Sequence, residues 1–186
     1  PKSGGGVPKS IGGGGGSAYS IDKTIDFEPA GFGASWTWNV FENGANPPLE
    51  FVANPNASGI NSSSKVAKFS ARQAGQPYAG VETAHGPTGM GITWDLSASR
   101  SKIRIMVYKT KISDVGIKLA NPAGGAQPEI KVANTKINEW EELVFDFSTI
   151  SGIPADAKFT QLVFRYDDAA DGTGEVIYID NIRLTN

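Results

Sequence analysis

Cysteine is absent from this 186-residue sequence, and histidine occurs once, as His85. Without cysteine the chain has neither a disulfide framework nor a thiolate metal site. A single histidine excludes a multi-histidine metal centre. A serine triad would have to use that one histidine, and no G-x-S-x-G motif is present to supply its nucleophile.

Charged residues are also few, and the two signs nearly balance. They make up 19% of the chain, with 17 lysines and arginines against 19 aspartates and glutamates. We therefore expect no basic surface for nucleic acid or anionic membranes. No apolar run approaches the roughly 18 residues of a membrane span, and no glycine-rich segment ends in the Gly-Lys-Ser/Thr of a phosphate-binding loop. Nothing resembles a charged-then-apolar signal segment, as expected of either a cytosolic chain or a mature, trimmed one.

Glycine, in contrast, is concentrated at the start of the sequence. Residues 1–20, PKSGGGVPKSIGGGGGSAYS, are of low complexity, and glycine disfavours order by its backbone entropy. We expect residues 1–20 to be a linker or tail and residues 21–186 to form one domain. The tail is either a tether to another domain or an element that packs on a neighbouring subunit.

The remainder of the chain has the pattern of an all-β protein. Apolar and polar residues alternate in short runs separated by Gly, Pro, Asn and Asp, and no 3.6-residue periodicity recurs. The pattern predicts a β-sandwich (jelly roll) of two antiparallel sheets with about ten strands. The runs are 24–28, 49–53, 65–71, 78–84, 101–110, 114–120, 128–133, 140–148, 159–166 and 175–184.

In the run 140–148, WEELVFDFS, the alternation is irregular. Placing Trp140 on the same apolar side as Leu143 requires a bulge or a strand start at Glu141 and Glu142.

Acidic side chains interrupt the first and last of these runs. Asp26 and Glu28 alternate with apolar residues near the start, and Asp180 and Asn181 lie in the middle of the last run. Two interpretations are open: ordinary polar residues at strand ends, or oxygen ligands of a calcium ion collected from strands distant in sequence. The acids lack the compact acid-x-acid-x-x-acid spacing of laminarinase-type sandwich hydrolases, so we expect no enzyme activity.

Four segments together indicate a family. IDFEP (25–29), FVANPNASGINSSSKVAKF (51–69), INEWEELVFDFS (137–148) and the closing IYIDNIRL (177–184) resemble the calcium-containing β-jelly-roll carbohydrate-binding modules found beside laminarinases and other secreted glycanases of marine Bacteroidetes. The resemblance covers about residues 24–185.

The resemblance implies a structural Ca²⁺. In this family an opening glutamate and a closing aspartate share the ion, and here they are Glu28 and Asp180. Backbone carbonyls near Lys65 would complete the shell, with Asp26 as a weaker candidate ligand. The two terminal strands are then expected to lie side by side, and Trp140 is expected in the core.

Sugar-binding candidates follow from the chemistry of lectin-like sites, which pair an aromatic platform with polar side chains. Trp36 and Trp38 lie two residues apart and share a face if the segment is extended, so they form either a platform or part of the core. Further candidates lie in the glycine-rich central segment and in polar loops, each with a structural role as its alternative. They are Tyr78, His85, Trp94, Arg72 and Asp168.

These observations favour a non-catalytic module that binds a polysaccharide, with a β-glucan such as laminarin as the first candidate. The resemblance implies a secreted or cell-surface bacterial protein, and a catalytic domain in the same parent chain is an expected partner. The alternative hypothesis is a structural or adhesive surface subunit that self-assembles through residues 1–20.

Overall fold

The computed structural model describes residues 23–150, 157–159, 161–165 and 175–186. The tail 1–20 and Asp168 therefore lie outside the described residues. The described part contains strands and one short 3-10 helix, η1 (Phe147–Thr149), and no helix in it is long and apolar enough to cross a membrane. The strands are β1 (Trp38–Phe41), β2 (Glu50–Ala53), β3 (Lys65–Ser70), β4 (Gly80–Thr83), β5 (Trp94–Leu96), β6 (Lys102–Lys109), β7 (Asp114–Ala120), β8 (Ile130–Ala133), β9 (Trp140–Asp146), β10 (Ala157–Phe159), β11 (Gln161–Arg165) and β12 (Val176–Thr185).

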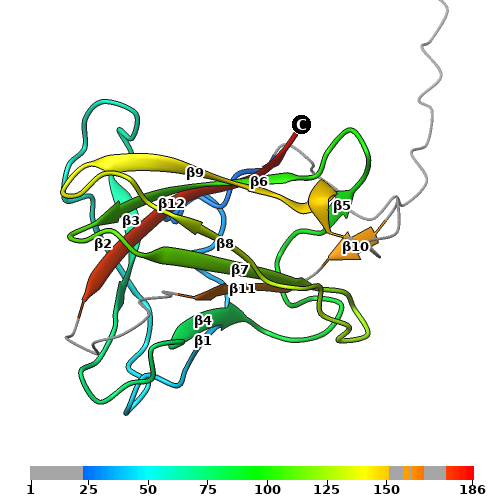
Figure 1. Ribbon diagram of the computed structural model, residues 1–186, viewed down its shortest axis with the longest axis horizontal. Helices are drawn as coiled ribbons and strands as arrows, with labels where there is room; N and C mark the ends of the chain where they lie inside the picture. The colour runs from blue at the N-terminus through cyan, green and yellow to red at the C-terminus, as the bar shows by residue number, and fades with distance from the viewer. Residues whose placement is uncertain (1–22, 151–156, 160, 166–174) are drawn as a thin grey trace, which may run out of the picture.

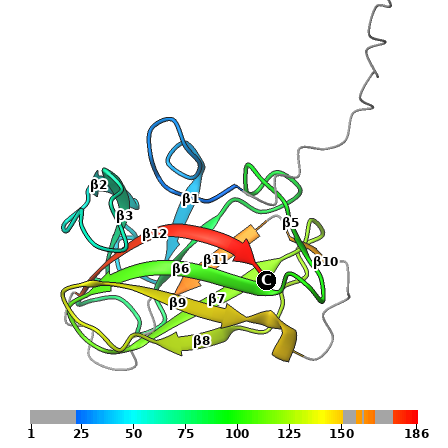
Figure 2. The ribbon, with the colours of Figure 1, turned by 90° about the horizontal axis from the view of Figure 1, so that it is seen from above.

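The strands form two stacked sheets, so the predicted all-β sandwich is confirmed. The first sheet has the order β1-β4-β11-β7-β8 and the second the order β2-β3-β12-β6-β9, while β10 pairs with β5 in a small ribbon. All strand pairs are antiparallel. Figure 1 shows the two layers edge-on, and Figure 2 shows the second sheet from above.

The core lies between the sheets because each central strand alternates in polarity. In β6, Ile103, Ile105 and Val107 are buried, and the residues between them are partly exposed on the outer face. β7 supplies Val115, Ile117 and Leu119 from the opposite sheet to the same cluster. This is the period-2 pattern of a strand with one face in the core.

The strand start expected near Glu141 and Glu142 is found one residue earlier, and the alternative, a bulge, is absent from β9. β9 begins at Trp140 and pairs with β6 in continuous register, from Tyr108 opposite Trp140 to Lys102 opposite Asp146. Trp140 therefore lies on the outer face, opposite to that of Leu143, and the prediction that they share a face is wrong. Trp140 is nevertheless buried against the segment that contains Asn54 and Asn56. Its indole nitrogen donates to the side chain of Asn54 and to the carbonyl of Asn56.

The first and last runs of the sequence meet, as expected. Ile25 and Ile182 exchange two backbone hydrogen bonds of 2.9 and 3.0 Å in an antiparallel bridge. The run 24–28 is not a full strand, however, because Phe27 has a positive φ of 54° that breaks the extended backbone. The register of β12 shifts between Asp180 and Arg183, and Asn181 there has a φ of 49°. The first segment and β12 are thus both bent where their acidic residues lie.

Candidate functional site

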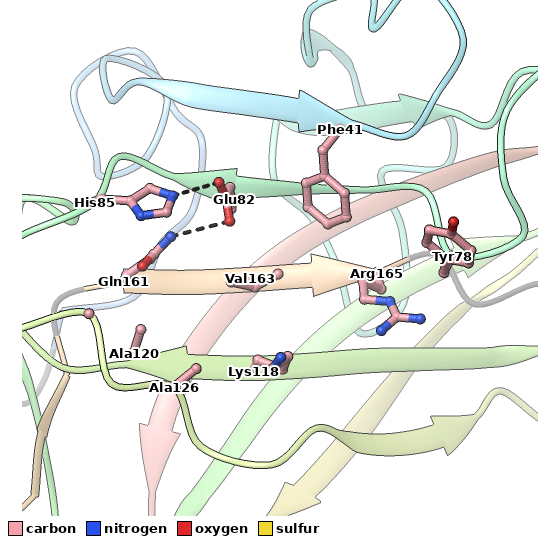
Figure 3. A pocket seen from close by; sticks show the side chains of 11 residues that line it. Phe41, Tyr78, Glu82, His85, Lys118, Ala120, Ala126, Gln161, Val163 and Arg165 are labelled. Carbon is pink, nitrogen blue, oxygen red and sulfur yellow. Dashed lines mark hydrogen bonds and ion pairs between the residues drawn. The ribbon is translucent and has the colours of Figure 1, made fainter.

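A hollow of about 320 Å³ lies on the outer face of the first sheet. Figure 3 shows that its side chains come from adjacent strands β1, β4, β11 and β7 and from the turn after β7. The sheet order explains this, because β11 is inserted between β4 and β7 although it is distant from both in sequence. On β11, Leu162 points into the core, whereas Gln161, Val163 and Arg165 line the hollow.

One end of the hollow is a set of hydrogen-bonding side chains. The Glu82 carboxylate contacts the Nε2 of His85 at 2.7 Å and accepts a hydrogen bond from the Gln161 amide at 3.2 Å (Figure 3). Gln161 is buried, while His85 is exposed. The Gln161 nitrogen also donates to the Thr83 carbonyl at 3.5 Å, so the arrangement fixes the Glu82 carboxylate at this end, where its oxygens can accept from hydroxyl groups of a ligand.

The other end of the hollow is aromatic. Tyr78 is 45% exposed, and Phe41 reaches the same end from β1 (Figure 3). The Arg165 guanidinium lies 5.7 Å from the centre of the Tyr78 ring, and its NH1 donates to Glu129 at 2.6 Å. An aromatic face beside charged and amide groups is the combination that suits a sugar ring, which has an apolar face and a hydroxyl edge.

Small residues keep the space between these ends open. Ala120, Gly124 and Ala126 form the wall that follows β7, and Lys118 and Val163 form the floor. The turn is held by the Asn121 side chain, whose Oδ1 accepts from the backbone nitrogens of residues 123 and 125 at 3.0 and 2.9 Å.

Two of the predicted sugar-binding residues, Tyr78 and His85, lie in this hollow. Arg72 lies elsewhere, beside Pro47, Pro48 and Lys68 in a second hollow. Sequence reasoning missed the other polar and aromatic lining residues: Phe41, Glu82, Lys118, Gln161 and Arg165. Their signal was present as the outward half of each alternating strand, but the alternation does not indicate which strands become neighbours.

Trp94 is 1% exposed and packs in the core, so the prediction that it contacts sugar is wrong. Glycines precede it in the sequence, but β5 places its ring inward. Trp36 and Trp38 stack on each other with ring centres 6.1 Å apart and planes 20° apart. Both are half-buried against the core, and the Trp38 indole donates to the Gly33 carbonyl at 2.8 Å. This pair therefore packs at the edge of the core and does not line the hollow on the first sheet.

The predicted calcium ligands converge on one short segment, residues 61–65. The Glu28 carboxylate accepts from the backbone nitrogens of Ser64 and Lys65 at 2.6 and 3.0 Å, and from the Ser64 hydroxyl at 2.6 Å. The Asp180 Oδ2 accepts from the Asn61 amide at 2.9 Å. The two acids thus contact opposite ends of one segment, Glu28 at Ser64 and Lys65 and Asp180 at Asn61.

Asp180 is the unusual member of this group because it is fully buried. Its Oδ1 has no hydrogen-bond partner among the described residues. Burial raises the pKa of Asp180 to about 6, against the lowering effect of hydrogen bonds from Ser63 and Asn61. In contrast, the Ser64 hydroxyl is the main cause that lowers the pKa of Glu28 below its usual value.

These residues fit a hard cation in chemistry. A buried carboxylate oxygen without a donor is a costly feature that a cation would relieve. In the described part of the chain no three acidic or histidine side chains converge, so carbonyl and amide oxygens would have to complete a shell. Lys65 offers its N–H to Glu28, and the carbonyls of Asn61 and Ser63 each accept from the Asn54 amide while keeping a second lone pair. The Asp26 Oδ1 accepts from the backbone nitrogens of Glu28 and Phe32.

The raised pKa of Asp180 predicts an unusual pH dependence in the demetallated protein. A carboxyl with a pKa of about 6 when folded and 3.8 when unfolded binds more protons in the folded state. Its stabilising contribution is about 3 kcal/mol, is full below about pH 4 and is lost as the pH rises through about 6. We expect the unfolding free energy of wild type minus that of Asp180→Asn, from urea titrations, to fall over this range. Parallel pH profiles for the two proteins would contradict the assignment.

No known protein family matches the sequence, and no curated protein matches it. Solved structures match the fold. An exo-β-agarase is 12% identical with a TM-score of 0.57, and an arabinose-bound GH51 α-L-arabinofuranosidase is 14% identical with a TM-score of 0.56. The match covers 88% of this chain in both cases but only 25% and 26% of those chains, so this chain spans about a quarter of their length. A mutant of CBM29-2, a family 29 carbohydrate-binding module, is 13% identical with a TM-score of 0.50, and the match covers 88% of this chain and 89% of that one.

Proposed function

We propose that this protein is a non-catalytic carbohydrate-binding module that binds a polysaccharide in the hollow on the first sheet. The observation that carries the proposal is the pairing, in one hollow, of the exposed Tyr78 ring with the Glu82–Gln161 hydrogen-bonding pair. The similarity of the fold to a carbohydrate-binding module over 88% of the chain supports it. A β-glucan such as laminarin is the first candidate ligand.

The absence of catalysis is proposed from the acids of the hollow. Glycoside hydrolysis ordinarily uses two carboxylates that flank the scissile bond. Among the described residues that line the hollow, Glu82 is the one carboxylate, and it is held by His85 and Gln161. This geometry supports holding a sugar rather than cleaving it.

We further propose that the module is secreted or at the cell surface and joined to a catalytic domain in its parent chain. A binding module of modest affinity then raises the effective concentration of substrate at the attached enzyme. The agarase and the arabinofuranosidase, which this chain matches over a quarter of their length, support such an arrangement.

A structural Ca²⁺ is proposed at Asp180 and Glu28, with oxygens of residues 61–65 as further ligands. Its support is the buried, unpartnered Asp180 Oδ1 and the contact of both acids with the same segment. The ion would stabilise the junction of the chain start with β12 and would take no part in sugar contact.

The test is calorimetric titration of the protein with laminarin, agaro-oligosaccharides, arabinan, galactan and hydroxyethylcellulose. We expect saturable heat with one glycan class and a loss of affinity of roughly 5- to 150-fold in Tyr78→Ala, since stacking on an aromatic ring contributes about 1–3 kcal/mol. The matched control is Tyr178→Ala on the second sheet, which packs on Tyr108 and should retain binding. Silence across the panel would reject the binding module and favour a self-assembling surface subunit.

A further inference from the structure

Glu129 does not line the hollow but lies beside its aromatic end, against the lining residue Arg165. It immediately precedes β8, which pairs with β7 so that Ile130 lies opposite Ile117 and Lys131 opposite Gly116. The Glu129 side chain crosses over Gly116: a Cβ on this glycine would lie 2.8 Å from Glu129 Oε1 and 2.9 Å from its Cδ. Gly116 thus leaves the space that the glutamate occupies.

The carboxylate of Glu129 is used on both of its oxygens. Its Oε2 accepts from Arg165 NH1 at 2.6 Å, and its Oε1 lies 3.7 Å from the ammonium of Lys131. The Glu129 side chain is only 12% exposed and that of Arg165 25%. A charge pair in this partly buried position is screened by salt less than an exposed pair, so it sets the local potential next to Tyr78.

One of the two bases that line the hollow is already paired with an acid beside it. The charged lining residues, apart from the titratable His85, are Glu82, Lys118 and Arg165, one acid against two bases. Glu129 lies directly against the Arg165 guanidinium, and its other oxygen faces Lys131. A carboxylate or sulfate on a glycan would therefore meet an Arg165 that is already paired, and Glu129 would oppose its approach to this guanidinium.

We propose that Glu129, held over Gly116, makes the hollow selective for neutral glycans over glycans that carry carboxylate or sulfate groups. The inference rests on the proposed function, because it assigns the substrate class of the same site. Glu129 is a positioning residue: it acts through Arg165, whose guanidinium it orients beside the Tyr78 ring, and a neutral sugar then receives hydrogen bonds from a fixed donor. A purely structural role for the Glu129–Arg165 pair would instead stabilise the sheet without affecting glycan preference.

The test compares glycans that differ only in charge: laminarin with carboxymethyl-laminarin, and hydroxyethylcellulose with carboxymethylcellulose. We expect wild type to bind a neutral member more tightly than its carboxymethylated partner. Glu129→Gln keeps the size and the hydrogen-bond acceptor and removes the charge. It should lower the preference for the neutral member by roughly tenfold at an ionic strength of about 10 mM, where the Debye length is about 30 Å, and by less at about 150 mM. The control is Glu50→Gln, which removes an exposed carboxylate from β2 of the other sheet and should leave the preference unchanged.

A second variant separates charge from folding. Gly116→Ala changes no charge, and the clash it creates is with a flexible side chain, so the sheet should tolerate it while Glu129 is displaced. We expect Gly116→Ala to shift the preference in the same direction as Glu129→Gln, and the double variant to show no further shift, because both act through one carboxylate.

The outcomes distinguish the two proposals. If wild type binds neutral glycan and Tyr78→Ala abolishes binding, but Glu129→Gln keeps the full neutral preference at low salt, the selectivity role is overturned and the binding module stands. If wild type prefers the carboxymethylated member, the selectivity role is also overturned. If wild type binds none of the glycans, the proposed function fails, and the selectivity role fails with it.

Discussion

Calcium is expected to raise the melting temperature of the demetallated protein at pH 7 by about 10 °C. Asp180 is buried with one oxygen unpartnered among the described residues, so its ionised form is unfavourable until a cation is present. A ligand at several hundred times its dissociation constant adds about 3–4 kcal/mol to the free energy of unfolding, and for a domain of this size each kcal/mol shifts the melting temperature by about 2–4 °C. Differential scanning calorimetry with and without calcium measures this directly.

Asp180→Asn separates the ion from the rest of the fold. The variant has no buried charge at this position, so we expect it to melt at or above the metal-free wild type at pH 7 and to lose the response to calcium. Glu28→Gln should weaken the response, because this side chain contacts the same segment as Asp180. Asp114→Asn, an exposed change at the start of β7, is the control that should keep it. A wild-type melt that is unaffected by calcium after exhaustive chelation would reject the ion.

The alternation of residues was sufficient to predict the fold class. In β6 every second residue of Lys102–Lys109 is buried, and this pattern follows directly from the geometry of a strand with one face in the core. The short strands β1, β5 and β10 escaped prediction, since three or four residues give too little alternation to recognise. The register of β9 was mispredicted because Trp140 is apolar and buried on the outer face, under the segment that contains Asn54 and Asn56.

The candidate site was predicted less well because it depends on strand order. Tyr78 and His85 were found from their residue types in a glycine-rich segment. Gln161 and Arg165 read as the polar side of a strand, and only the insertion of β11 between β4 and β7 brings them to Glu82 and Lys118. Such long-range pairing is not encoded in any local pattern. The contact of residues 25–28 with β12 was anticipated only through the resemblance to a family.

Replacing Trp94 by alanine is expected to destabilise the domain by about 4 kcal/mol. The ring is 1% exposed in β5, opposite Phe159 in β10, and removing so large a buried side chain leaves a cavity whose cost is typically 3–5 kcal/mol. The melting temperature should fall by roughly 8–16 °C. Trp36→Ala is the matched control: its ring is half-buried and stacked on Trp38, so we expect a smaller loss of stability.

Trp94→Ala and Tyr78→Ala should then separate stability from binding. Trp94 supports the fold from within the core, so the Trp94→Ala protein that remains folded at low temperature should bind glycan with nearly the wild-type affinity. Tyr78 is exposed at the hollow, so Tyr78→Ala should lose binding and melt close to the wild type. A Trp94→Ala protein that kept its melting temperature and lost binding would place this ring at the surface. It would also move the sugar site from the face of the first sheet to the region around β5, because an aromatic platform must be exposed to contact a sugar.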